Sequence, residues 1–174
     1  MIDVRPERLS DYEKVYAVQQ AAFDRPNEAR LVEALRASAG MQLSLVAERA
    51  GQVVGHVFFS PVEIEPPQPS PPVGGLAPVG VLPEWQGRGI GSALIRGGLE
   101  GCAALGWRAV VLVGNPKYYA RFGFVLAAPR GLRYESEAFD SAFQLLELTP
   151  GALADCRGWV RYPKAFAETG TTGP

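Results

Sequence analysis

The part of this 174-residue sequence most suited to chemistry is a glycine-rich turn between an apolar run and a segment with helical spacing. The run covers residues 76–82, and the turn holds Gly87, Gly89 and Gly91. Glycines allow backbone angles that aim successive N–H groups at one point, and the first N–H groups of a helix have no partner within it. These groups also lie at the positive end of the helix dipole, where main chain alone can bind a phosphate. We therefore predict an anion-binding turn.

The spacing of the glycines separates the kinds of phosphate ligand. No lysine follows them, as the GxxxxGK[ST] loop of ATPases and GTPases requires. They run G-x-G-x-G after four intervening residues, whereas the dinucleotide fingerprint GxGxxG directly follows a strand. The pattern present is Gln86-x-x-Gly89-x-Gly91, preceded by Val81-x-Pro83. The alternative interpretation is a tight turn that only starts a helix.

A second distinctive segment, residues 118–124, reads Tyr-Tyr-Ala-Arg-Phe-Gly-Phe. With the turn, it resembles the GNAT acetyltransferases: the turn is similar to their acetyl-CoA-binding motif, and this segment to their Tyr-x-x-x-Gly-Phe motif. The resemblance covers nearly the whole chain. An early ARLVEALRA segment and a late VRYPKAF segment resemble a bacterial subgroup of predicted acetyltransferases.

The resemblance implies where acetyl-CoA would lie. N–H groups of residues 87–92 would hold the pyrophosphate, and Arg88 would add positive charge. Main-chain groups of residues 79 and 81 would meet the pantetheine arm and thioester at a bulge, for which Gly80 is the expected position. One of those N–H groups would stabilise the oxyanion of the tetrahedral intermediate. The expected coenzyme-binding residues are Val79, Gly80, Val81, Gln86, Gly87, Arg88, Gly89, Ile90, Gly91, Ser92, Asn115 and Tyr118.

The same resemblance assigns the catalytic acid. Tyr119 stands four residues before the glycine of Gly-Phe and would protonate the leaving thiolate. A tyrosine suits this task because its ordinary pKa near 10 leaves it protonated at neutral pH. Tyr118 is expected to form a wall. Asn115 would either cap the following helix or bond to the pantetheine, and the sequence leaves both open.

The general base stays unassigned. Many GNAT enzymes carry an acidic residue on the strand before the loop, whereas residues 76–82 contain none. Glu63 and Glu65 end the neighbouring strand and could act as base directly or through water, but are interpreted as solvated charges. His56, the only histidine, is a second candidate base, but is interpreted as a buried sheet residue whose hydrogen bonds are satisfied.

We expect an N-acetyltransferase that moves the acetyl group of acetyl-CoA to a primary amine of a small molecule or peptide, by direct attack in a ternary complex. A first alternative is a non-catalytic sensor or scaffold with the same fold that only binds acyl-CoA. A second is a nucleotide-binding protein that uses the same loop.

The elements that must position these residues alternate in an α/β order, with hairpins first and crossovers later, which predicts a mixed sheet. We expect a GNAT fold with helices on both faces, in one domain over residues 1–174. Residues 149–174 would be extended chain packed on the body, with frayed last residues. Expected strands cover residues 2–5, 43–48, 53–64, 76–82, 109–113, 124–127 and 143–148, and expected helices 10–23, 28–38, 90–105 and 117–122.

Composition limits the class of protein and its partners. A net charge of −1 does not favour nucleic-acid or membrane-surface binding, and the polar start lacks a secretory apolar core, so we expect a cytoplasmic protein. Cys102, Cys156 and one distant histidine predict neither a disulfide framework nor a metal site. The sequence does not identify the acceptor. The last third of the chain is locally basic, which would suit an acidic acceptor or would be ordinary surface. The oligomeric state is open, with a homodimer as one alternative.

Overall fold

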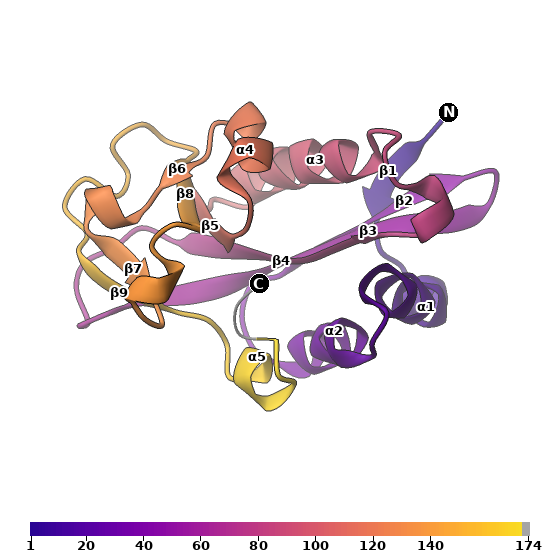
Figure 1. Ribbon diagram of the computed structural model, residues 1–174, viewed down its shortest axis with the longest axis horizontal. Helices are drawn as coiled ribbons and strands as arrows, with labels where there is room; N and C mark the ends of the chain where they lie inside the picture. The colour runs from indigo at the N-terminus through magenta and orange to yellow at the C-terminus, as the bar shows by residue number, and fades with distance from the viewer. Residues whose placement is uncertain (172–174) are drawn as a thin grey trace.

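The computed structural model describes residues 1–171, in which a mixed sheet carries helices on both faces (Figure 1). Helices α3 and α4 cover one face, and α1, α2 and α5 cover the other. The predicted fold class is confirmed. The strands are β1 Asp3–Pro6, β2 Leu43–Arg49, β3 Gln52–Glu65, β4 Val73–Val81, β5 Ala109–Val113, β6 Val125–Leu126, β7 Leu132–Tyr134, β8 Phe143–Glu147 and β9 Gly158–Arg161. The helices are α1 Tyr12–Phe23, α2 Asn27–Ala37, α3 Ile90–Ala104, α4 Pro116–Tyr119 and α5 Ala165–Glu168, with short 3-10 turns such as Pro83–Trp85.

Strands β4 and β5 are parallel neighbours for only a short distance. The sheet order is β1-β2-β3-β4-β5-β8-β6, and the β4–β5 ladder joins residues 73–75 to residues 109–111. Strand β4 continues to Val81 and β5 to Val113 without further pairing to each other, although β4 still pairs with β3 and β5 with β8. The two strands therefore part in the middle of the sheet.

The bulge of β4 lies at a different place from the one predicted. Gly80 pairs with His56 in regular register, while residues 77–78 together face Phe58 of β3. The ladder breaks there because a proline at position 78 has no N–H to donate. Position 80 is a glycine for another reason: a Cβ there would lie 2.6 Å from Oε1 of Gln19 on α1.

The segment after residue 128 contains more regular structure than predicted. Strand β7 lies between residues 128 and 142, where no strand or helix was expected, and the expected extended segment of residues 149–174 includes β9 and α5. Strand β9 pairs with β7 and with the far end of β3, and Asn27 on α2 donates a hydrogen bond of 3.0 Å to the carbonyl of Thr169. These pairings join residues that are far apart in the chain, so no local sequence pattern predicts them. Residues 172–174, expected to fray, lie outside the described part.

Helix α3 contains three interior glycines that let it lie close to the sheet. A Cβ on Gly98 would stand 2.3 Å from the Phe59 ring, and one on Gly101 would stand 2.7 Å from Leu43. Each glycine costs the isolated helix about 1 kcal/mol relative to alanine. Close packing against a buried sheet face compensates for that loss.

Replacing Gly98 with alanine should therefore destabilise the protein, although helix propensity alone predicts the opposite. The added methyl group overpacks the interface with Phe59, at a cost of about 1–3 kcal/mol. Urea unfolding measures the change. The double variant Gly98→Ala, Phe59→Leu should lose less than the sum of the single variants. A more stable Gly98→Ala protein would contradict this account.

Candidate functional site

The glycine turn forms the entrance to α3. Gly87 and Gly89 adopt left-handed angles, with φ of +72° and +81°, and Gly89 is the N-cap residue directly before α3. Gln86 reaches back and donates a hydrogen bond of 3.0 Å to the carbonyl of Val81. This bond ties the loop to the end of β4, so loop and strand act as one unit.

The loop leaves a row of main-chain donors unused. Among residues 1–171, the N–H groups of residues 87–92 donate to no other described group, and the turn from Gln86 to Gly89 is exposed. They border a cleft of about 510 Å³ that Val81, Tyr118 and Arg121 also line. Free N–H groups at a helix start suit an anion with several oxygens, such as a pyrophosphate.

The positive charge of this cleft comes from a residue that the sequence analysis did not select. Arg121 lines it, donates to the carbonyl of Tyr118 at 2.9 Å and holds its guanidinium 4.3 Å from that ring. Arg88, expected in this role, lies over the Trp85 ring at 4.9 Å and outside the cleft lining. The sequence contains a pattern that indicates this role, because Arg121 follows Tyr118 by three residues and therefore lies on the same face of a helix.

Helix α4 presents two neighbouring tyrosines to different cavities. Its start is capped by Asn115, whose Oδ1 accepts a hydrogen bond of 3.0 Å from the N–H of Lys117. The rings of Tyr118 and Tyr119 meet edge-on, with centroids 4.9 Å apart. The Tyr118 hydroxyl lies 3.4 Å from Oγ of Ser92 at the cleft, whereas Tyr119 turns toward the gap between β4 and β5.

A second cavity, of about 270 Å³, occupies that gap. Pro78 and Val79 of β4 line it on one side, and Val113 of β5 with Tyr119 on the other. Burial, together with nearby Tyr118, raises the pKa of Tyr119 to about 12. Tyr119 therefore keeps its proton at neutral pH and can donate it.

The residues weighed as general bases lie elsewhere. His56 is fully buried, and its ring bonds to Gln19 and Ser44 at 2.8 Å on each side. Burial and the charge of Arg36 lower its pKa to about 3. Glu63 and Glu65 line a different hollow beside the proline-rich loop.

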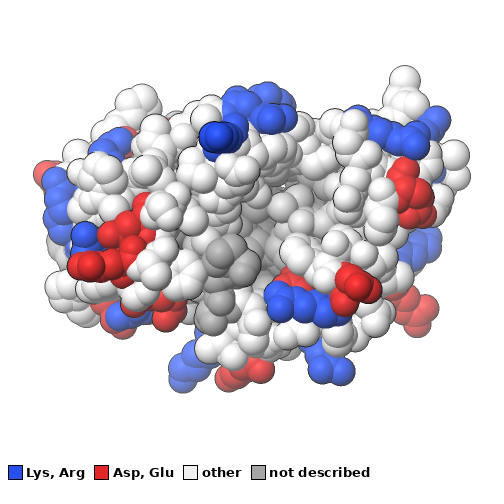
Figure 2. Space-filling model, viewed as in Figure 1, with Lys and Arg blue, Asp and Glu red and all other residues white. Residues whose placement is uncertain are grey.

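The carboxylate that does line the gap is Glu28 on α2, which the sequence analysis missed. It is buried, and Arg25 on the turn before α2 is its partner. Nothing in the local pattern distinguishes Glu28 from the other charged residues of its helix. Figure 2, oriented as Figure 1, shows a hollow near the centre of this view, with basic side chains above it and charges of both signs below it.

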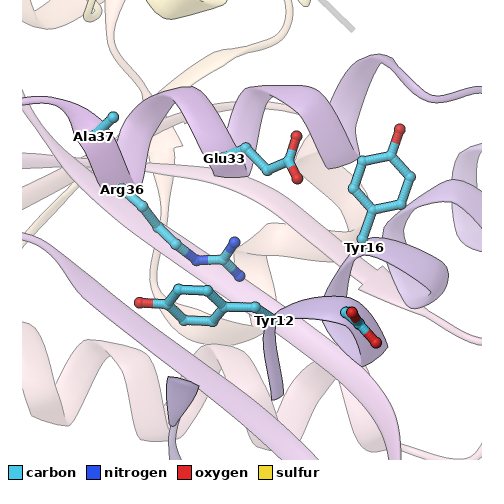
Figure 3. Close-up of a pocket in the computed structure, with 6 residues that line it drawn as sticks. Tyr12, Tyr16, Glu33, Arg36 and Ala37 are labelled. Carbon is cyan, nitrogen blue, oxygen red and sulfur yellow. The ribbon is translucent and has the colours of Figure 1, made fainter. Parts of the chain in front are cut away.

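Another hollow lies between α1 and α2 (Figure 3). The Arg36 guanidinium stands 3.8 Å from the Tyr12 ring and also pairs with Glu7. Glu33 and Tyr16 also line this hollow, and neither is among the predicted site residues. We interpret this cluster as a link between α1, α2 and the chain before them.

Residues 1–171 contain neither a candidate metal site nor a candidate membrane-spanning helix. No three His, Cys, Asp or Glu side chains gather where a metal ion could bind. In that same part of the chain, no helix combines the length and apolar character that crossing a membrane requires.

Comparison with known proteins places the chain in a family. A model of the acetyltransferase (GNAT) domain matches residues 3–127. The Escherichia coli K12 protein named "Uncharacterized N-acetyltransferase YhbS" is 37% identical over 164 residues, which cover 94% of this chain and 97% of that protein. A second Escherichia coli K12 protein, "Uncharacterized N-acetyltransferase YjhQ", is 39% identical over 117 residues, or 66% of this chain and 65% of its own length.

Solved structures agree with the sequence relatives. The crystal structure of Escherichia coli YhbS in complex with CoA superposes with a TM-score of 0.89 at 36% identity, covering 95% of this chain and 92% of that one. A GNAT acetyltransferase from Brucella melitensis in complex with acetyl-CoA gives a TM-score of 0.78 at 39% identity, covering 95% and 98%. With its sheet, its parted strands and its free loop amides, this chain belongs to the GNAT acetyltransferase family.

Proposed function

We propose that this protein transfers the acetyl group of acetyl-CoA to a primary amine by direct attack in a ternary complex. The observation that carries the proposal is the row of free N–H groups at residues 87–92, which border the cleft. Strand β4 connects the two parts of the site, because its Val81 lines this cleft and its Val79 lines the cavity between β4 and β5. The YhbS and Brucella melitensis structures contain CoA and acetyl-CoA, which supports the same ligand here.

The residues present suit the parts of that ligand. The loop amides would hold the pyrophosphate, with Arg121 as the nearby cation and Tyr118 as a wall. Beyond residue 75, β4 does not pair with β5, so the main-chain groups of Val79 and the N–H of Val81 are available to the pantetheine arm and thioester, while the Val81 carbonyl accepts from Gln86. The acyl end would then reach the cavity beside Tyr119.

The transfer needs one bond made and one broken. The neutral acceptor nitrogen attacks the thioester carbonyl carbon, the C–S bond breaks, and the Tyr119 hydroxyl donates its proton to the departing sulfur. The nitrogen loses one proton to solvent, from which Tyr119 recovers its own. A main-chain N–H of β4 at the gap would stabilise the oxyanion while it exists.

Gly89→Ala should weaken CoA binding much more than it weakens the fold. Alanine in a left-handed conformation costs about 1–2 kcal/mol, and relief of that strain would turn the loop amides away. We expect a Kd for CoA roughly tenfold higher, or about 1.4 kcal/mol of binding energy. Isothermal titration calorimetry measures the Kd.

Gly51 provides a matched control in the turn between β2 and β3. It has the same φ of +81°, and a Cβ on either residue meets nothing within 4 Å. Gly51→Ala should therefore lose similar stability and retain full CoA affinity. Equal CoA affinity in the two variants would remove the loop assignment.

Tyr119→Phe should lower kcat by roughly 10²-fold while leaving the Kd for CoA nearly unchanged, because an acid acts in the transition state. Release of free thiol from acetyl-CoA with a panel of amines gives kcat. Tyr118→Phe removes the same atom from the adjacent ring and should retain most of kcat. Equal loss of kcat and CoA affinity in Tyr119→Phe would indicate packing, and CoA binding without turnover on any amine would favour the sensor alternative.

A further inference from the structure

The cavity between β4 and β5 contains one carboxylate that the transfer chemistry above does not use. Glu28 lines it, and its side chain is only 6% exposed. Nε of Arg25 donates to its Oε1 at 2.8 Å, and a second guanidinium nitrogen donates to Oε2. The carboxylate is thus held by both of its oxygens.

The surroundings of Glu28 make a cationic partner necessary. The cavity walls nearby are apolar, including Phe23, Leu31 and Phe166. A carboxylate removed from water among such groups is costly unless a cation or several donors face it. In the described part of the chain, Arg25 is the cation that pairs with Glu28.

Arg25 is an exchangeable partner. Its side chain is 45% exposed, and it lies on the short turn between α1 and α2. A guanidinium so exposed loses little when it returns to water, whereas the buried carboxylate cannot be left alone. A different cation that enters the cavity can therefore replace Arg25.

An anionic acceptor fits this arrangement poorly. Binding a carboxylate through Arg25 would draw that guanidinium from Glu28 and leave the buried charge unpaired. The basic residues of the last third do not supply an alternative, because among residues 1–171 Arg25 is the only lysine or arginine that lines the cavity.

We propose that Glu28 is the acceptor-binding carboxylate, that it pairs with the ammonium group of a cationic amine with an apolar body, and that Arg25 occupies it until that amine arrives. The bound ammonium releases one proton to solvent before the transfer, which leaves the neutral nitrogen that attacks the thioester. The proposal rests on the acetyltransferase function for its biological meaning. The ion exchange itself needs no turnover.

Binding of three probes of equal chain length tests the exchange: pentylamine, pentan-1-ol and 5-aminopentanoate. Each is titrated at constant ionic strength, with and without CoA, and thermal shift and calorimetry report binding. Pentylamine should bind roughly tenfold or more tightly than the alcohol, since it adds a charged hydrogen bond to a buried carboxylate. The alcohol lacks the cation. 5-Aminopentanoate has the ammonium group, but its other end is a carboxylate that would enter an apolar cavity whose cation, Arg25, already faces Glu28, so both should bind weakly.

Variants of the pair should act in opposite directions. Glu28→Gln should remove the preference for pentylamine over pentan-1-ol, and Arg25→Gln should tighten pentylamine binding roughly tenfold because the competing cation is gone. Two exposed positions on the same helix provide matched charge controls. Glu33→Gln and Arg30→Gln should change neither preference.

Several results would overturn the proposal. These are pentylamine binding no tighter than pentan-1-ol, 5-aminopentanoate binding most tightly, or Arg25→Gln weakening pentylamine binding as a merely structural ion pair would. Since Arg25→Gln makes its own prediction, the proposal stays testable if Glu28→Gln does not fold. Failure of the acetyltransferase function is a separate result: no CoA binding or no thiol release, with the pentylamine preference intact.

Discussion

The constraint on which the rest of this structure depends is the early separation of β4 from β5. Two parallel strands in the middle of a sheet ordinarily satisfy each other's main-chain groups along their length. Here three residues of each strand do so, and the rest of β4 then runs beside a cavity. The free edge offers hydrogen-bonding groups inside the protein, where they would be costly without a ligand or water to meet them.

Two features of the sequence keep that gap open. Pro78 interrupts the β3–β4 ladder at a bulge, which increases the local twist of β4. Tyr119 and Val113 then fill the β5 side with side chains where main chain would otherwise pair. On the α1 face, Gly80 admits α1 so closely that Oε1 of Gln19 reaches the strand, so the sheet stays covered there.

The proposed coenzyme cleft and the gap are mechanically joined. Gln86 bonds to the end of β4, Ser92 on α3 approaches Tyr118 on α4, and Tyr118 contacts Tyr119 edge-on. Helix α3 is in turn seated on the sheet through its glycines. A ligand that orders the loop would therefore also restrain the tyrosine proposed as acid, which is the preorganisation that transfer chemistry needs.

The sequence by itself determined the features that depend on near neighbours. Glycines with left-handed angles and the start of α3 at Ile90 follow from local backbone rules, and the tyrosine motif was identified by its resemblance to the family. The sequence left the role of Asn115 open, and the structure shows it as the cap of α4. Only the tertiary structure decided what depends on distant partners. It placed the bulge at residues 77–78, sealed His56 against Gln19 and Ser44, formed β9 and α5 in the late segment, and brought Glu28 to the cavity that Tyr119 lines. The physical reason is that a strand pairing or a buried charge acquires its energy from residues that only the completed fold brings together.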